Sequence, residues 1–186
     1  MSGLMLVTGG ARSGKSTYAE TVAQESGLAI GYIATGLAMD ADMSARIERH
    51  KAQRPADWPT FEMYRDFAAL EDDARFDACG LFLLDCLTIL VTNHMMDSGL
   101  DFDVCPASEV DRLEESVAAE VDALLDLMAR CGKRLIVVTN EVGMGVVPAF
   151  RMGNLFRDMA GRMNARVARR ADEAVCMISG LPLRLK

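Results

Sequence analysis

Residues 9–16 read Gly9-Gly10-Ala11-Arg12-Ser13-Gly14-Lys15-Ser16 and match the pattern G-x-x-x-x-G-K-[ST]. Glycines in such a loop let the backbone wrap closely around an anion and point its N–H groups at phosphate oxygens. An apolar run, Leu4–Thr8, precedes the loop, and a helical pattern, Ser16–Ser26, follows it. Strand, loop and helix in this order predict a phosphate-binding loop (P-loop), in which Lys15 reaches the β- and γ-phosphates and Ser16 binds Mg²⁺.

Apolar runs and helical patterns alternate along the rest of the chain. Further apolar runs are Ile30–Ala34, Leu81–Asp85, Leu135–Thr139 and Ala174–Ile178. The helical patterns are Asp40–Arg54, Cys86–Met96, Ser108–Cys131 and a helix within Asn154–Arg170. Continuous apolar runs are typical of strands that are buried on both faces of a parallel sheet. The sequence therefore predicts an α/β fold, a P-loop NTPase-type three-layer sandwich with a mainly parallel sheet flanked by helices, in one domain over residues 1–186.

The helical pattern near residue 108 carries its own start signal. Ser108 is followed three residues later by Asp111, a pair that resembles a capping box and predicts the helix N-terminus there. Apolar residues recur at helical spacing behind it, and the opposite face carries acidic residues, namely Glu114, Glu115, Glu120 and Asp122. We interpret this segment as a helix packed on the sheet with a solvated acidic face.

The amino-acid composition limits which partners the protein can bind and in which cellular compartment we expect it. Acidic residues outnumber basic ones by 27 to 20, which gives a net charge of −7 and disfavours nucleic acids and anionic membranes as partners. The five cysteines are scattered without a CxxC pair, so we expect free, buried thiols in a reduced compartment. Neither a signal peptide nor an apolar stretch of 18 residues is present. We therefore expect a cytoplasmic protein with no membrane span.

Two further segments are candidates for chemistry. Leu81–Asp85 has the form of a strand that ends in a metal-binding carboxylate, although many buried strands end in Asp without such a role. In the segment Asp40–Arg54, the side chains of Arg46, His50 and Arg54 are spaced to share one helix face. A neutral imidazole among cations could serve as a nucleophile, but the same pattern fits a solvated face, and the residues alone leave both interpretations open.

Several short motifs, in order along almost the whole chain, carry a family resemblance. They are Thr8–Ser16, Tyr32–Gly36, Arg46–Lys51 with Arg54-Pro55 and Trp58, Leu84–Thr88, Thr139–Gly145, Phe156–Asp158 with Gly161–Asn164, and Ser179–Pro182. In these motifs the chain resembles the bifunctional adenosylcobinamide kinase and adenosylcobinamide-phosphate guanylyltransferase family of cobalamin biosynthesis. A P-loop alone is generic, whereas this series of separate motifs is specific.

The resemblance implies two reactions. The first phosphorylates the aminopropanol hydroxyl of adenosylcobinamide, and the second transfers GMP from GTP to adenosylcobinamide phosphate through a guanylylated histidine, which corresponds to His50. The resemblance also implies GTP, ATP and Mg²⁺ as ligands and a homo-oligomer, specifically a trimer. Lys15 then joins His50 as a catalytic residue, and the metal is held by Ser16 and Asp85. The implied nucleotide contacts are Gly9, Gly10, Ala11, Arg12, Ser13, Gly14, Lys15, Ser16, Ala34, Thr35, Gly36, Lys51, Ala52, Gln53, Arg54, Glu62 and Asp85.

Two alternatives stay open at this point. One is a P-loop small-molecule kinase that forms no covalent intermediate. The other is a nucleotide-gated regulatory protein without enzymatic turnover. GTPase switches usually carry the base-reading sequence Asn-Lys-x-Asp, and the nearest stretch here, Asn140-Glu141-Val142-Gly143, lacks both the Lys and the Asp. This difference disfavours a GTPase switch.

Overall fold

The computed structural model describes residues 3–36, 55 and 57–186. Its centre is a seven-stranded sheet with the strand order β3-β2-β4-β5-β1-β6-β7. Neighbouring strands are parallel except for β7, which pairs antiparallel with β6. The strands are β1 (Leu4–Gly9), β2 (Ile30–Ala34), β3 (Thr60–Glu62), β4 (Leu81–Asp85), β5 (Arg134–Val138), β6 (Glu173–Ile178) and β7 (Leu181–Arg184).

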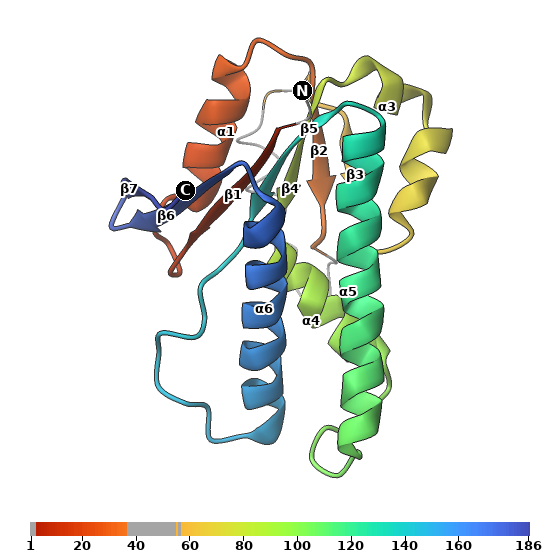
Figure 1. Ribbon diagram of the computed structural model, residues 1–186, viewed down its shortest axis with the longest axis vertical. Helices are drawn as coiled ribbons and strands as arrows, with labels where there is room; N and C mark the ends of the chain where they lie inside the picture. Colours follow the sequence, from red (N-terminus) through yellow and green to blue (C-terminus); the bar gives the residue numbers. More distant parts are fainter. Residues whose placement is uncertain (1–2, 37–54, 56) are drawn as a thin grey trace.

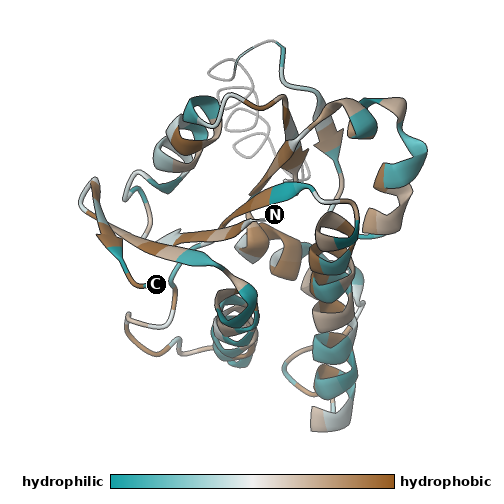
Figure 2. Cartoon of the chain, turned by 45° about the horizontal axis from the view of Figure 1, so that its top comes forward, coloured by the Kyte–Doolittle hydropathy of each residue, from teal (hydrophilic) through white to brown (hydrophobic). Residues whose placement is uncertain are grey.

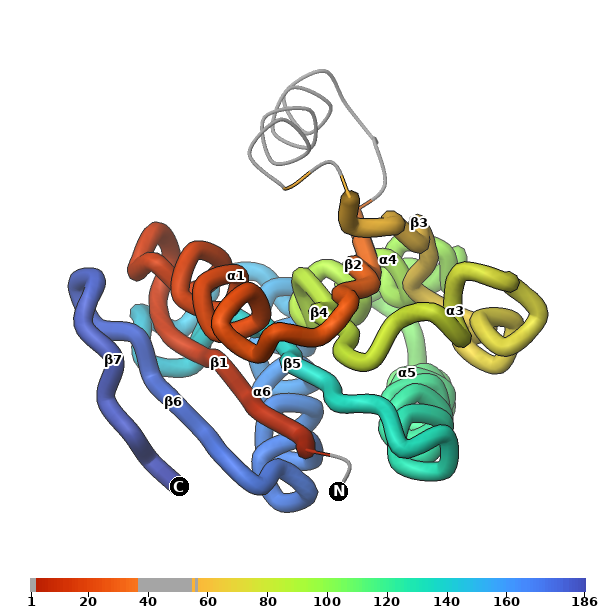
Figure 3. The backbone as a smooth tube through the Cα atoms, turned by 90° about the horizontal axis from the view of Figure 1, so that it is seen from above, coloured from red at the N-terminus to blue at the C-terminus, as the bar shows by residue number. Residues whose placement is uncertain are grey.

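Helices cover both faces of the sheet, so the fold has three layers. The helices are α1 (Lys15–Glu25), the 3₁₀ helix η1 (Phe67–Asp72), α3 (Ala74–Ala78), α4 (Leu87–Asp97), α5 (Ala107–Arg130) and α6 (Arg151–Arg170). Helix α1 lies on one face, whereas α5 and α6 lie on the other (Figures 1 and 3). The predicted α/β sandwich with a mainly parallel sheet is therefore confirmed.

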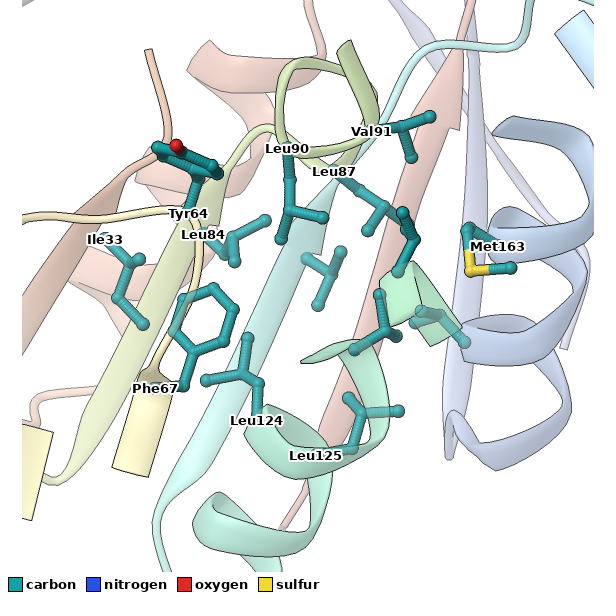
Figure 4. Close-up of a cluster of buried hydrophobic side chains, with 14 of the residues drawn as sticks. Ile33, Tyr64, Phe67, Leu84, Leu87, Leu90, Val91, Leu124, Leu125 and Met163 are labelled. Atoms are coloured by element: carbon teal, nitrogen blue, oxygen red, sulfur yellow. The ribbon is translucent and has the colours of Figure 1, made fainter. Parts of the chain in front are cut away.

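Side-chain alternation along the strands divides the core into two halves. In β4, Leu81 and Leu83 pack on the α1 side, and Phe82 and Leu84 pack on the side of α5 and α6. Figure 4 shows part of the larger half, in which Leu84 lies near Phe67 and Leu124. The central strands are hydrophobic along their length, while α5 and α6 also carry hydrophilic residues (Figure 2). A strand covered on both sides must be apolar at every position, which explains the continuous runs in the sequence.

Most predicted elements agree with the structure to within one residue at each end. Strands β2 and β4 have the predicted bounds, and α6 begins three residues before Asn154. Strands β3 and β7 were not predicted, because β3 has only three residues and all four residues of β7 are exposed. The predicted helix Asp40–Arg54 lies outside the described residues.

The structure corrects two details of α5. Ser108 does not cap the helix, because Pro106 occupies the N-cap position and no side-chain cap is formed. The acidic face is also only partly solvated, since Glu114 forms an ion pair with Arg162 and Asp122 forms one with Arg166. The hydrogen bond from Arg166 lowers the pKa of Asp122. Helix α5 therefore uses its acidic face to bind the basic side of α6.

All five cysteines are free, as expected. Cys79, Cys86 and Cys105 are buried, but Cys131 and Cys176 are partly exposed, so the expectation that all five are buried was wrong for these two. Among the described helices, none is both long and apolar enough to cross a membrane.

Candidate nucleotide site

The loop after β1 has the backbone of a P-loop. Gly9 and Gly14 adopt positive φ angles of 143° and 90°, which L residues with a side chain rarely adopt. A Cβ atom on Gly9 would lie 2.4 Å from the carbonyl oxygen of Met177 in the neighbouring strand β6. The first glycine of the motif is therefore required both by its φ angle and by the close approach of β6.

Lys15 and the small residues of the loop form a compact cradle. The Nζ atom of Lys15 donates to the carbonyl oxygen of Gly10 at 2.6 Å. The N–H of Gly180, in the turn between β6 and β7, donates to the carbonyl oxygen of Ser13 at 3.1 Å and supports the loop from behind. Among the described residues, neither the buried hydroxyl oxygen of Thr8, in β1, nor that of Ser13, in the loop, has a hydrogen-bond partner. Buried polar atoms are normally paired, so two unpaired hydroxyls in and next to the loop suit a polar ligand.

Asp85 ends β4 at the same edge of the sheet. Its Oδ2 atom accepts a hydrogen bond of 3.1 Å from the hydroxyl of Tyr32 in β2. Thr35 fixes the chain just beyond Asp85, because its hydroxyl donates to the carbonyl oxygen of Cys86 at 2.8 Å and accepts from the N–H of Cys86 at 2.9 Å. Asn93 of α4 donates to the Thr35 carbonyl oxygen at 2.6 Å. The buried Thr35 side chain thus positions Asp85.

A second polar network fixes the end of β5, which lies between β1 and β4. The hydroxyl of Thr139 donates to Oδ1 of Asn164 in α6 at 2.6 Å, and Nδ2 of Asn164 donates to the carbonyl oxygen of Asn140 at 3.0 Å. The side chain of Asn140 continues the network to Thr88 at 2.8 Å. The N–H of Glu141 then donates to the carbonyl oxygen of Gly9 at 3.0 Å. Asn164 therefore connects α6 to the segment beside the P-loop.

Replacement of Asn164 by alanine should lower the free energy of unfolding by about 2 kcal/mol, because it leaves the buried Thr139 hydroxyl and the Asn140 carbonyl oxygen without their partner. The midpoint of urea unfolding measures this change. Asn154→Ala, in the same helix but at a partly exposed position, is the matched control and should cost less. Equal midpoints for the two variants would contradict a structural role for the Asn164 network.

The predicted site residues fall into three groups. The P-loop, the residues Ala34–Gly36 and Asp85 lie at the carboxyl edge of the sheet, with Asp85 two strand positions from β1, which corresponds to about 10 Å. Glu62 ends β3 at the same edge but four strand positions from β1, about 19 Å away, so the structure does not bring it to the P-loop. His50 and its neighbours Lys51, Ala52, Gln53 and Arg54 lie outside the described residues.

The second histidine of the chain, His94, has a structural setting. It is buried in α4, and its Nε2 atom lies 3.2 Å from the carbonyl oxygen of Tyr64. The Tyr64 ring also packs edge-on against it. Burial lowers the pKa of His94, which keeps the imidazole neutral. These contacts make His94 a core residue.

The residues at this edge fit a magnesium nucleotide. Mg²⁺ is usually held by one or two carboxylates, hydroxyls and the phosphates of the substrate, so it does not require a protein cage of several acidic residues. The Ser16 hydroxyl, at the start of α1, and the Asp85 carboxylate supply ligands of this kind. In the described part of the chain, no group of three or more His, Cys, Asp or Glu residues could hold a metal on its own. The oxygen ligands therefore suit a metal that arrives with phosphates.

Comparison with known proteins identifies the family. The model of the family described as cobinamide kinase / cobinamide phosphate guanyltransferase matches residues 5–185. The chain belongs to this family. It is 40% identical over 183 residues to the bifunctional adenosylcobalamin biosynthesis protein CobU of Escherichia coli strain K12, covering 98% of this chain and 99% of the relative. CobU of Salmonella typhimurium is 41% identical over 186 residues, with 98% and 99% covered. CobP of Pseudomonas aeruginosa is 40% identical over 182 residues, with 97% and 96% covered.

Two solved structures are similar to this chain at a lower sequence identity than these relatives. The flagellar accessory protein FlaH of Methanocaldococcus jannaschii is 12% identical, with a TM-score of 0.46, and the match covers 99% of this chain and 78% of FlaH. The KaiC-like protein PH0186 of Pyrococcus horikoshii is 14% identical, with a TM-score of 0.44, and the match covers 94% and 70%.

Proposed function

We propose that this chain catalyses both reactions of its family. It phosphorylates the aminopropanol hydroxyl of adenosylcobinamide and then transfers GMP from GTP to adenosylcobinamide phosphate, giving adenosylcobinamide-GDP and pyrophosphate. The observation that carries this proposal is the family match over residues 5–185, which includes a complete P-loop. The bifunctional relatives match over nearly their whole length, so the chain has the extent of a two-activity enzyme.

In the kinase reaction the protein positions groups and neutralises charge. The backbone N–H groups of the P-loop bind the phosphates, and Lys15 moves from the Gly10 carbonyl oxygen to the β- and γ-phosphates. Ser16 and Asp85 would hold Mg²⁺, which when bound neutralises charge on the phosphates. Tyr32 and Thr35 keep the Asp85 carboxylate and the chain beyond it in place.

The transferase reaction requires attack on the α-phosphorus of GTP. We assign the nucleophile to His50, whose neutral imidazole can form a phosphoramidate with GMP and release pyrophosphate. Arg46, Lys51 and Arg54, close to His50 in the sequence, would stabilise the negative charge that develops.

Asp85→Asn tests the metal assignment. The substitution preserves shape but removes a negative charge, so Mg²⁺-dependent kinase activity should fall by about 100-fold and require a higher Mg²⁺ concentration for half-maximal rate. Titration of kinase activity with Mg²⁺ measures both effects. If the variant responds to Mg²⁺ as the wild type does, the Asp85 carboxylate has only a structural role.

The proposed function also implies an oligomeric state and a cellular compartment for this protein. We propose a homotrimer, and the exposed apolar side chains of the C-terminal hairpin, Ile178, Leu181 and Leu183, support a contact between subunits there. Five free cysteines support a reducing compartment such as the cytoplasm. Light scattering coupled to size-exclusion chromatography should give three times the mass of one chain.

The direct test incubates the protein with a nucleoside triphosphate, Mg²⁺ and adenosylcobinamide and identifies the products by mass spectrometry. Adenosylcobinamide phosphate should form with ATP or GTP, and adenosylcobinamide-GDP only with GTP. The phosphate alone, even with GTP, would favour the second candidate, a small-molecule kinase without a covalent intermediate. Formation of neither product would exclude both candidates.

A further inference from the structure

We propose that Glu141 is a catalytic residue of the kinase step, in which its carboxylate accepts the proton of the attacking hydroxyl. This inference rests on the proposed kinase reaction and adds to it a residue role. An alcohol is a poor nucleophile while it keeps its proton, and kinases commonly use a carboxylate to orient the hydroxyl and take that proton. Among the residues that the structure describes, Glu141 is the carboxylate whose position and hydrogen bonding suit this task.

The position of Glu141 follows from the strand order. Glu141 lies three residues beyond the end of β5, and β5 is the strand between β1, which leads into the P-loop, and β4, which ends in Asp85. Its N–H donates to the carbonyl oxygen of Gly9, the first residue of the P-loop motif, at 3.0 Å. Glu141 is therefore attached directly to the loop that holds the transferred phosphate.

The backbone on both sides of Glu141 is fixed. Asn164 holds Thr139 and Asn140 through the two hydrogen bonds described above. On the other side, the N–H of Gly143 donates to Oε1 of Glu141 at 2.7 Å. A Cβ atom on Gly143 would lie 2.9 Å from that Oε1 atom, which shows how closely the carboxylate approaches this backbone. The carboxylate is thus oriented by one of its oxygens.

The second carboxylate oxygen is available for a proton. Within the described part of the chain, Oε2 of Glu141 has no hydrogen-bond partner, and the side chain is only partly buried. The residue is therefore accessible to a substrate hydroxyl while its orientation is set through Oε1. An acceptor of this kind meets the geometric requirement for a general base.

Two other carboxylates follow parallel strands in the described residues, and neither has the same placement. Asp85 lies one strand further from β1, accepts a hydrogen bond from Tyr32 and is assigned to the metal. Glu62 ends the outermost strand of the parallel set, about 19 Å from β1. Glu141 alone of these three follows a strand that is adjacent to β1.

The proposed kinase step transfers the γ-phosphoryl group of the nucleotide to the hydroxyl oxygen of the substrate. The hydroxyl oxygen forms a bond to the γ-phosphorus, the bond from that phosphorus to the bridging oxygen of the β-phosphate breaks, and the nucleoside diphosphate leaves with the electron pair. The hydroxyl proton passes to Oε2 of Glu141 and from there to solvent. In the transferase step the acceptor is a phosphate, which is already ionised at neutral pH because its second pKa is about 6, and no proton has to be removed. The two reactions should therefore differ in their need for Glu141.

The variant Glu141→Gln tests whether the kinase step needs the Glu141 carboxylate while the transferase step does not. The amide keeps the size of the side chain and an oxygen for Gly143, but it cannot accept a proton. With adenosylcobinamide as substrate, kcat/KM of the kinase should fall by about 10²- to 10⁴-fold. With chemically supplied adenosylcobinamide phosphate and GTP, the same preparation should form adenosylcobinamide-GDP at the wild-type rate, which also shows that it is folded. Glu115→Gln, at an exposed position of α5, is the matched control and should leave both rates unchanged.

Two results would overturn the proposal. Kinase activity of Glu141→Gln at the wild-type level would show that the carboxylate takes no part in the reaction. Loss of both activities together would show that Glu141 has a structural role. Failure of the proposed function has a different signature, because the wild type itself would then make no adenosylcobinamide phosphate.

Discussion

Lys15→Ala is expected to lower kcat/KM of the kinase step by at least about 10³-fold. Lys15 is the second residue from the end of the loop, and its ammonium group already lies inside the cradle, 2.6 Å from the Gly10 carbonyl oxygen. The charge it supplies to the β- and γ-phosphates is needed most when the bond between them breaks. Initial rates of adenosylcobinamide phosphate formation measure the loss.

Lys133→Ala is the control for charge removal. Lys133 precedes β5 at the opposite, amino-terminal edge of the sheet, where its Nζ atom donates to the carbonyl oxygens of Asp77 and Cys79. This variant should keep its kinase activity, and thermal unfolding of both variants should show cooperative transitions. A Lys15→Ala enzyme that phosphorylates at the wild-type rate would disprove the P-loop assignment.

His50→Ala is expected to reduce guanylyl transfer by about 10⁴-fold or more while much of the kinase activity remains. The transfer step requires a nucleophile, which alanine lacks, whereas the kinase step requires the P-loop and the metal ligands. GTP with a radioactive α-phosphate should label the wild type covalently, and the label should be lost in acid because a phosphoramidate is acid-labile. His50→Asn should behave in the same way as His50→Ala.

His94→Gln is the matched control, because His94 is the other histidine of the chain and lies in the core against Tyr64. It should still be labelled by GTP. A labelled His50→Ala protein, or one that makes adenosylcobinamide-GDP at the normal rate, would exclude His50 as the nucleophile. The cationic segment around His50 would then serve only to bind phosphates.

The fold was largely predictable because its central strands are buried on both faces. The residues of β2, and those of β4 up to its last residue, Asp85, form uninterrupted apolar or small-residue runs, so the bounds of both strands could be read from the sequence. Strands at the edges of the sheet are harder to predict, because they are less buried and need not be apolar throughout. Strand β7 is exposed along its length, contains Pro182 and is held by pairing with β6, which is a contact that no local pattern reveals. The predicted start of α5 was within one residue of the observed one, but the capping role of Ser108 was wrong, because Pro106 occupies the N-cap position.

The candidate site was predictable where one short segment carries the chemistry. The P-loop Gly9–Ser16 was predicted from its spacing and from the strand and helix on either side, and the structure shows these elements there, while its contacts with a nucleotide stay a prediction. The supports of the loop could not be assigned, because Gly180, Asn164 and Thr35 act through partners far away in the sequence. Thr35 was expected to contact the nucleotide, and that role stays a prediction, while the structure shows that its hydroxyl binds the backbone of Cys86. In the sequence, Glu141 could be recognised only as part of the motif Thr139–Gly145. Its position beside Gly9 could not be predicted without knowing that β5 lies next to β1.

The position of β1 has a consequence for the synthesis of the protein. Strand β1 is made before its two neighbours in the sheet, β5 and β6, which follow it by more than 120 residues, and the turn at Gly180 that supports Ser13 is made later still. Contacts between such distant parts of a chain form late. A nascent chain on the ribosome therefore has an unpaired first strand and an unsupported phosphate loop. The phosphate loop therefore gains its full set of supports only after the segment through Gly180 has been synthesised.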